Sequence, residues 1–251
     1  MSEYLLADTD SERARLRRQA DVWEPAARSL LAQLGPGDGR RALDVACGPL
    51  GWLRALVDAG WTAVGADVAP QLVAAAQEEV PGAEVVQDDL FATRLEPGSF
   101  DLVHARFVLA PLGRWDEQLE VYRRLVRPGG LLVLEEPDTG SWHFNPPAPN
   151  AERLIELILE AFRTAGGDFD AGRALRSLLE GIGATPQVAA HVVALAPGDP
   201  YLRVPLQFAH SLRARLDAAE AGPLVAAAEE EIADPGRWGM SFTVVQAWTT
   251  L

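Results

Sequence analysis

The sequence predicts an α/β fold built on a doubly wound, mostly parallel sheet, and three observations support this prediction. Between residues 40 and 136, short apolar runs alternate with segments of helical periodicity, as in a parallel sheet with helices on both faces. The first run ends at a tight turn, Cys47-Gly48-Pro49, after which a helical pattern begins. The second run ends in Asp67, where an acid in such folds binds ribose hydroxyls. A ligand site is therefore expected at the carboxyl ends of the strands.

The individual elements follow from periodicity. A helix is expected over residues 11–34, because Ser11 can cap it and Leu16, Ala20 and Trp23 recur at helical spacing. The alternating region then predicts strands near 41–46, 62–66, 83–87, 100–105 and 130–135, and helices near 51–59, 70–79 and 115–126, with a shorter one around 91–95. Further helices are expected at 151–165, 171–182, 204–219 and 223–233, and β-branched runs predict strands at 188–195 and 241–248.

Composition limits the classes of partner. The chain has 251 residues, 48% of them apolar, a formal net charge of −14, and no lysine. An acidic balance argues against nucleic acid, whose phosphates need a basic surface, and against anionic membranes. The substrate is therefore expected to be small and not polyanionic. The abundance of Ala, Arg and Gly without Lys suggests a GC-rich bacterial genome.

Cysteine usage and the start of the chain bear on its compartment. Cys47 is the one cysteine, so neither an internal disulfide nor a zinc cluster is expected, which fits a reducing cytoplasm. We expect Cys47 to be a packing residue rather than a nucleophile. The first residues lack a signal-peptide pattern, and no apolar window is long enough to span a membrane.

The turn after the first strand does not identify a ligand by itself. Ala46, Gly48 and Gly51 have the spacing of the dinucleotide fingerprint G-x-G-x-x-G, with alanine in the first place. This turn is therefore compatible with a nicotinamide or flavin enzyme, and also with an ordinary strand-to-helix connection.

Five short motifs together distinguish between these alternatives. They are residues 43–48 (Leu-Asp-Val-Ala-Cys-Gly), 65–67 (Gly-Ala-Asp), 87–90 (Gln-Asp-Asp-Leu), 99–109 (Ser-Phe-Asp-Leu-Val-His-Ala-Arg-Phe-Val-Leu) and 125–136 (Leu-Val-Arg-Pro-Gly-Gly-Leu-Leu-Val-Leu-Glu-Glu). In order and spacing they resemble the class I S-adenosylmethionine-dependent methyltransferases, and residues 166–173 resemble a bacterial small-molecule branch of that family. Ala46 and Leu50 depart from the usual glycines.

The resemblance implies a seven-stranded, Rossmann-like sheet whose last strand is antiparallel, with S-adenosylmethionine at its edge. Asp67 would bind the ribose, Asp89 the adenine amine, and the Leu90 backbone the adenine ring; capping of a helical turn is the alternative for Asp88 and Asp89. The expected cofactor-binding residues are Asp44, Ala46, Cys47, Gly48, Asp67, Val68, Asp88, Asp89, Leu90, His104 and Ala105.

Three regions follow from the same resemblance. Residues 1–39 would be a helical lid segment, 40–136 the cofactor-binding core, and 137–251 the rest of the sheet with a helical cap inserted at about 196–240; the alternative for this insertion is a dimerisation or packing element. The expected acceptor-binding residues are Tyr4, Gln19, Trp23, Arg106, Phe107, Trp142, Phe144, Phe208 and His210, with Trp238 and Met240 near the pocket. The alternative for Trp23 is that it docks the N-terminal helix on the core.

Catalytic residues are harder to identify, because methyl transfer mainly requires alignment and needs a base only when the acceptor must lose a proton. His143 and His104 are the candidate bases, and the alternative for each is a hydrogen-bonded structural histidine. Metal-dependent catechol-type relatives place an aspartate where this chain has His104, so no metal is expected. Glu135 and Glu136 would face the sulfonium or an acceptor amine, or lie in a solvated loop.

We therefore expect an enzyme that methylates an oxygen, nitrogen or carbon atom of a small molecule, such as a secondary metabolite, as a monomer or homodimer. Two alternatives remain open at this point. One is a protein that binds S-adenosylmethionine without methylating, and the other is an NAD-dependent oxidoreductase.

Overall fold

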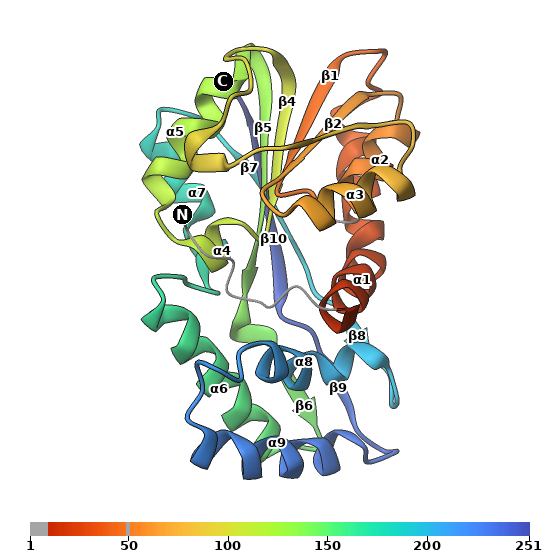
Figure 1. Cartoon of the computed structure of the whole chain (residues 1–251), viewed down its shortest axis with the longest axis vertical. Helices are drawn as coiled ribbons and strands as arrows, with labels where there is room; N and C mark the ends of the chain where they lie inside the picture. Colours follow the sequence, from red (N-terminus) through yellow and green to blue (C-terminus); the bar gives the residue numbers. More distant parts are fainter. Residues whose placement is uncertain (1–9, 49–50) are drawn as a thin grey trace.

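The centre of the molecule is one twisted sheet of seven strands (Figure 1). The computed structural model describes residues 10–48 and 51–251. The strand order is β3-β2-β1-β4-β5-β10-β7, and β10 runs antiparallel to both of its neighbours. This confirms the predicted seven-stranded, mostly parallel sheet. The strands are β1 (Arg41–Val45), β2 (Thr62–Asp67), β3 (Glu84–Gln87), β4 (Phe100–Arg106), β5 (Val126–Asp138), β7 (Gln187–His191) and β10 (Thr243–Thr250).

Helices cover both faces of this sheet because its central strands are apolar on both sides. Alternate residues point to opposite faces, so Ala42 packs under one set of helices and its neighbour Leu43 under the other. The first set is α1 (Asp10–Leu34), α2 (Trp52–Asp58) and α3 (Pro70–Glu79). The second is α4 (Leu109–Leu112), α5 (Trp115–Leu125) and α7 (Ala171–Gly181). Helix α1 continues through Pro25.

A cap lies beyond the carboxyl ends of the parallel strands, at the lower end of Figure 1. It has its own apolar core, in which Phe144, Ile158, Phe208 and Phe242 are buried. Its helices are α6 (Pro149–Thr164), α8 (Val204–Ser211) and α9 (Ala218–Ile232), preceded at α8 by a 3-10 turn, η3 (Pro200–Arg203). A three-stranded sheet, β6 (His143–Asn145), β9 (Trp238–Met240) and β8 (Ala194–Leu195), completes it.

The cap differs from the single insertion expected at about 196–240. Helix α6 packs against α8 and α9, and β6 pairs with β9, so the stretch after β5 supplies half of the cap. The helix expected over 204–219 ends at Ser211, and a new helix begins after Asp217, which caps α9 by accepting a hydrogen bond from the Ala219 N–H. The stretch 139–150, which is rich in proline and aromatic residues, contains the 3-10 turn η2 (Thr139–Ser141) and β6.

The strand expected over 188–195 is divided between the two sheets. Residues 187–191 belong to β7 and pair with β10, whereas Ala194 and Leu195 pair with β9. Ser241 holds the crossing point: its hydroxyl accepts from the Val193 N–H at 3.0 Å, and its own N–H donates to the Val193 carbonyl at 2.9 Å. The chain thus passes from the main sheet into the cap without leaving these backbone groups unpaired.

Helix α1 is fastened to the cap by a buried hydrogen bond. The indole N–H of Trp23 donates to the hydroxyl of Tyr201 at 3.1 Å, and the Trp23 ring packs on Phe242 with centroids 5.6 Å apart. Trp23 was expected in the acceptor pocket or as a docking residue, and the structure shows it docking α1 on the cap core.

Within residues 10–48 and 51–251, no helix combines the length and the apolar character needed to cross a bilayer.

We predict that Tyr201→Phe destabilises the protein, because it leaves the buried Trp23 indole N–H without its acceptor. The loss should be about 1–3 kcal/mol in the free energy of unfolding, measured by chemical denaturation. In a cycle with Trp23→Phe, the double variant should lose less than the sum of the single losses. If the loss in the double variant equals the sum of the two single losses to within about 0.5 kcal/mol, the two side chains are not energetically linked.

We also predict a pH dependence from Glu136 at the end of β5, whose carboxyl accepts from the N–H groups of Val108, Leu109 and Ala110 at the start of α4. Burial raises the pKa of Glu136 to about 8, although these N–H groups lower it. Between its ordinary pKa of 4.5 and about 8 the folded chain binds more protons than the unfolded chain, so this group's contribution to the free energy of unfolding falls as pH rises.

Denaturation at several pH values checks this expectation. The Glu136→Gln variant should show a weaker decline in stability across that window than the wild type. Glu120→Gln, which removes a carboxyl that is 75% exposed on α5, serves as the matched control and should keep the wild-type slope. Equal slopes for all three proteins would refute the assignment.

Candidate functional site

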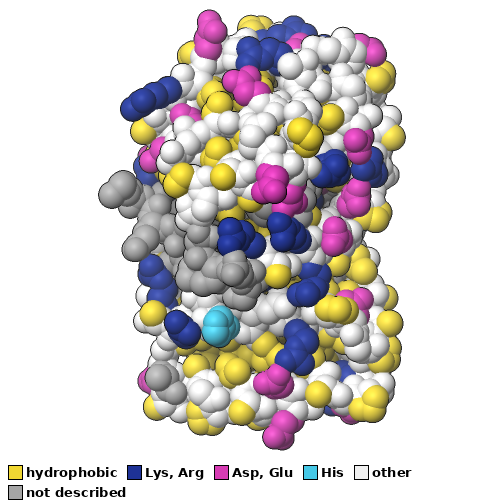
Figure 2. All heavy atoms as spheres, turned by 45° about the vertical axis from the view of Figure 1, so that its right-hand side comes forward, with side chains coloured by type: hydrophobic (Ala, Val, Ile, Leu, Met, Phe, Trp, Pro, Cys, Tyr) yellow, Lys and Arg dark blue, Asp and Glu magenta, His cyan; other side chains and the backbone are white. Residues whose placement is uncertain are grey.

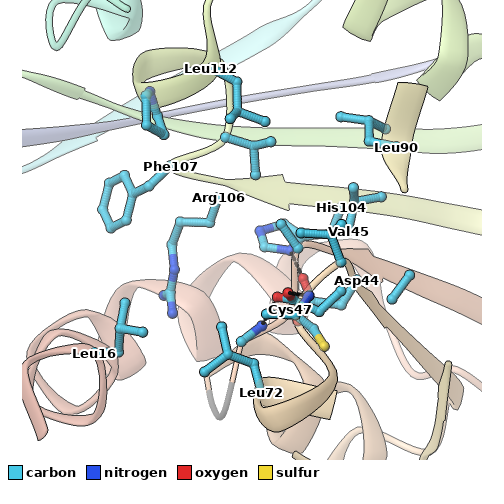
Figure 3. A pocket seen from close by; sticks show the side chains of 18 of the residues that line it. Leu16, Asp44, Val45, Cys47, Leu72, Leu90, His104, Arg106, Phe107 and Leu112 are labelled. Atoms are coloured by element: carbon cyan, nitrogen blue, oxygen red, sulfur yellow. Dashed lines mark hydrogen bonds and ion pairs between the residues drawn. The ribbon is translucent and has the colours of Figure 1, made fainter. Parts of the chain in front are cut away.

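A cavity lies at the carboxyl ends of β1 to β4, between the sheet, helix α1 and the cap. Its lining combines four acids and the turn after β1 with several phenylalanine side chains. In Figure 3, Asp44 and Cys47 lie on one side of Arg106 and Phe107 lies on the other. Strand order reverses between β1 and β4, which is where open α/β sheets bind their ligands. In Figure 2, arginine side chains are frequent across the middle of the visible face, and hydrophobic side chains are prominent below them.

The turn after β1 is held to the end of β2 by Asp67. Its carboxylate accepts from the Gly48 N–H at 3.0 Å and from the Ala69 N–H at 2.9 Å, and only 7% of the residue is exposed. Burial raises the pKa of Asp67 despite these donors. Ala46 has φ 50°, a left-handed conformation that glycine adopts more readily, which explains why glycine is usual there.

Cys47 packs beneath this turn. A Cβ on Gly65 would lie 2.8 Å from its sulfur, so the thiol fits only because residue 65 has no side chain. Burial raises the pKa of the Cys47 thiol far above its ordinary range, with nearby Asp44 and Asp67 adding to the effect. The thiol therefore stays protonated, as a packing residue would.

Asp88 and Asp89 follow β3 and also line the cavity. Asp89 accepts from the Phe91 N–H at 3.0 Å and so caps a 3-10 turn, η1 (Leu90–Ala92), and Asp88 accepts from the Arg94 N–H at 3.0 Å. The capping alternative is thus present in the structure. Because each of these bonds uses one carboxylate oxygen, capping is compatible with a second partner in the cavity.

His104 is fixed from two sides at the end of β4. Its Nδ1 lies 2.7 Å from Asp44 Oδ1, and its ring stacks on Trp52 with centroids 4.0 Å apart. Burial lowers the pKa of His104, but the hydrogen bond to Asp44 and the nearby Glu135 carboxylate outweigh it and raise the pKa above its ordinary value. These neighbours favour the protonated imidazolium, which donates protons rather than accepting them, so the geometry does not support His104 as a general base.

Glu135 and Glu136 are both buried, so neither lies in a solvated loop, and neither lines the cavity. Glu135 Oε2 accepts from the Trp52 indole at 2.8 Å, while Oε1 accepts from the Gln246 amide. Burial alone would raise the pKa of Glu135, but His104 and Arg106 lower it overall. Glu135 is thus a carboxylate beneath the cavity floor. Glu136 instead accepts hydrogen bonds from the backbone at the start of α4.

Most of the expected site residues lie together. Gln19, Arg106, Phe107 and Phe208 line the cavity, as do all the expected cofactor residues except Ala105. Ala105 points to the opposite face of the sheet, into the core under α4 and α5. Tyr4 lies outside the described residues.

Other expected residues lie elsewhere. His143 is exposed on β6, where its Nδ1 lies 2.8 Å from the Ser141 carbonyl oxygen, so its position does not fit a general base. His210 is also exposed. Trp142 and Phe144 pack in the cap core and do not line the cavity, because their positions in η2 and β6 turn them towards the cap. Neither Trp238 nor Met240 lines it.

Several lining residues were not anticipated. Arg15 lies one helical turn before Gln19 and hydrogen-bonds to it, and its guanidinium lies over the Phe208 ring at 4.6 Å. The four-residue spacing from Gln19 could have identified it. Phe162, Phe169 and Phe242 extend the aromatic end, and they come from separate parts of the cap whose association no local pattern reveals.

Across the part of the chain that the structure describes, no three His, Cys, Asp or Glu side chains come together in a way that could hold a metal ion.

Comparisons with known proteins identify the family of this chain. A family model described as a methyltransferase domain matches residues 16–187. An uncharacterized 37.1 kDa protein in transposon TN4556 of Streptomyces fradiae is 36% identical over 132 residues, 49% of this chain and 38% of that protein. The malonyl-[acyl-carrier protein] O-methyltransferase of Enterobacter lignolyticus is 30% identical over 188 residues, 67% of this chain and 72% of that enzyme.

Among solved structures, phosphoethanolamine N-methyltransferase 2 of Haemonchus contortus, in complex with phosphomonomethylethanolamine and S-adenosylhomocysteine, aligns with a TM-score of 0.54 at 17% identity over 90% of this chain and 52% of that one. At that identity the likeness shows the fold. The chain thus spans between about two fifths and three quarters of the length of these relatives. The family match covers most of the chain, and the chain belongs to the class I S-adenosylmethionine-dependent methyltransferases.

Proposed function

We propose that the protein transfers a methyl group from S-adenosylmethionine to an oxygen, nitrogen or carbon atom of a small-molecule acceptor. The observation that supports this most is a single cavity that joins an acid-lined half at the strand ends to an aromatic half under the cap. A cofactor in the first half and an acceptor in the second would meet inside one cavity, which is what a displacement reaction requires.

The acid-lined half suits the nucleoside of the cofactor. Asp67 is buried and fixed by two backbone N–H groups, so it can accept from ribose hydroxyls without moving. Asp89 and the Leu90 backbone lie at the neighbouring strand end, in reach of a base bound beside the ribose, and Leu72 and Val68 supply apolar contacts. The sulfonium of the bound cofactor supplies the methyl group.

The aromatic half suits an acceptor with an apolar body. Phe169 and Phe208 meet edge to face with centroids 5.7 Å apart, and Phe107 meets Phe242 in the same way at 5.8 Å. Such walls exclude water and hold a flat or branched apolar group. The expectation of an acceptor that is not polyanionic agrees with this lining.

The protein's contribution to the reaction is therefore mainly alignment. Asp44 and Glu135 raise the pKa of His104, which disfavours a proton-accepting imidazole, and His143 lies outside the cavity, so we assign neither as the base. Orientation and exclusion of water can together supply about 7–11 kcal/mol of the barrier reduction.

Calorimetric titration tests the cofactor assignment. We expect S-adenosylmethionine and S-adenosylhomocysteine to bind and NAD not to bind. Asp67→Ala should weaken both by about 10- to 100-fold, because it removes a buried charged hydrogen-bond acceptor. Asp101→Ala is the matched control, since Asp101 lies at the opposite end of β4, paired with Arg127.

Binding of NAD alone, or undiminished binding by Asp67→Ala, would refute the assignment. Incubation with cofactor labelled in its methyl group, together with a cell extract as the source of acceptors, separates methyl transfer from mere binding. Label that never reaches an acceptor would favour a non-methylating reaction.

A further inference from the structure

One long strand edge of the molecule is open. Strand β7 lies at the end of the seven-stranded sheet, with β10 as its neighbour, and the chain continues from β7 into β8 at the edge of the cap sheet. Figure 1 shows this run passing from the main sheet down into the cap. Residues 187–195 span about 30 Å when extended. An edge of this length presents backbone N–H and C=O groups to which another strand can bond.

The two other sheet edges are protected. At β3, the Gln77 side chain accepts from the Val85 N–H and donates to the Ala83 carbonyl, both at 3.1 Å. In the cap sheet, β6 has three residues and is soon followed by Pro146 and Pro147, which lack an N–H. Such side-chain bonds and prolines prevent the addition of a strand. In the described part of the chain, no side chain bonds to the backbone of β7 in this way.

The hydrogen bonds at the end of this run show which backbone groups point outward. The Val193 N–H donates to the Ser241 hydroxyl, and the Val193 carbonyl accepts from the Ser241 N–H, so the backbone of Val193 faces inward. The direction of these groups alternates along a strand. The N–H and C=O groups of Val188, Ala190 and Val192 therefore point away from the sheet.

Strand β10 gives the same assignment from its other side. Leu251 exchanges backbone hydrogen bonds with Gly129 and Gly130 of β5. By alternation, Gln246 bonds to β7 instead, where it is opposite Ala189. Ala189 thus faces inward, and its two neighbours in the strand face outward.

This edge is uncharged in a chain that is otherwise acidic. Residues 181–198 contain no Asp, Glu, Lys or Arg, whereas the whole chain has a formal net charge of −14. Val188 and Val192 are 42% and 40% exposed, and both are on this edge. Two copies of an acidic chain repel each other where their carboxylates meet. They can approach most closely at a surface that has none.

We propose that β7 pairs antiparallel with β7 of a second copy of this chain, about a two-fold axis through Ala190. Val188 then lies opposite Val192 of the second copy, so all three outward-facing residues exchange N–H···O bonds and the exposed valines form two pairs. An axis through Ala189 would place Pro186, which has no N–H, opposite Val192 and lose a bond.

The pairing closes the assembly. It joins the two sheets into one of fourteen strands, seven from each copy. Both open edges are used in it, so a two-fold contact of this kind ends at a dimer and leaves no edge for a third copy.

Sedimentation equilibrium of the full chain tests this proposal. The wild type should dimerise with a dissociation constant in the micromolar range, because one strand per copy makes a small interface. Ala190→Glu and Ala190→Lys each place two like charges opposite one another at the axis, and each should weaken dimerisation about 100-fold or more. In an equimolar mixture of the two variants, opposite charges meet there, and a heterodimer should form with an affinity within about tenfold of wild type.

Ala74→Glu is the matched control, since Ala74 is exposed on α3, which covers β2 and β3 at the opposite end of the sheet. This variant should dimerise as the wild type does. A wild type that stays monomeric far above micromolar concentration overturns the proposal, as does a dimer that Ala190→Glu leaves intact. Assemblies larger than a dimer contradict the closed two-fold pairing, and a mixture without heterodimer contradicts the axis through Ala190.

Hydrogen exchange on the wild type gives a second test that does not depend on the folding of any variant. The amides of Val188, Ala190 and Val192 should become protected as the protein concentration rises, while those of Ala189 and His191, which face β10, stay protected at every concentration. Exchange at the three outward amides that is the same at all concentrations overturns the proposal. Neither measurement involves cofactor or methyl transfer, so its result is independent of the proposed function.

Discussion

A carboxylate enclosed in the centre of the protein, Glu135, is the constraint on which the rest of the site depends. Its oxygens are bonded to Trp52 of α2 and Gln246 of β10, and His104 and Arg106 of β4 lie beside it. Removing a charge from water is costly unless it is paired and hydrogen-bonded, so these neighbours are required to keep Glu135 charged. Three of these neighbours, Trp52, His104 and Arg106, also line the cavity.

The same polar groups continue across the sheet. Asp44 bonds to His104, Glu135 to Gln246, and Gln246 Oε1 lies 2.9 Å from His191 Nε2, so the row runs from β1 through β4, β5 and β10 to β7. Strand register places these side chains on one face, under α1 and α2. The strand ends that line the cavity are therefore positioned by hydrogen bonds that lie within the core. This links the geometry of the site to the stability of the fold.

The fold could be predicted well from the sequence, whereas the site could be predicted only in part. Alternation of strand and helix over 40–136 is a local signal, and the acids at strand ends follow from it. The cap was less predictable, because the pairing of β6 with β9 joins residues nearly one hundred positions apart and no local pattern encodes it. The electrostatic state of His104 depends on Asp44 and Glu135 from other strands, so the residue was identified but its role was not. Likewise, Trp142 and Phe242 are both aromatic in the sequence. The sequence does not reveal that Phe242 lines the cavity whereas Trp142 does not.

The way the cap is joined to the sheet limits how molecules can enter and leave. Four stretches of chain cross between them: β5 continues into η2 and β6, α6 into α7, β7 into β8, and β9 into β10. A hinged opening of the cap would have to bend all four at once, whereas α1 contacts the cap through the packing of Trp23 on Tyr201 and Phe242 and of Arg15 on Phe208. Any widening of the cavity should therefore come from a movement of α1 relative to α8 rather than from a hinge between the cap and the sheet.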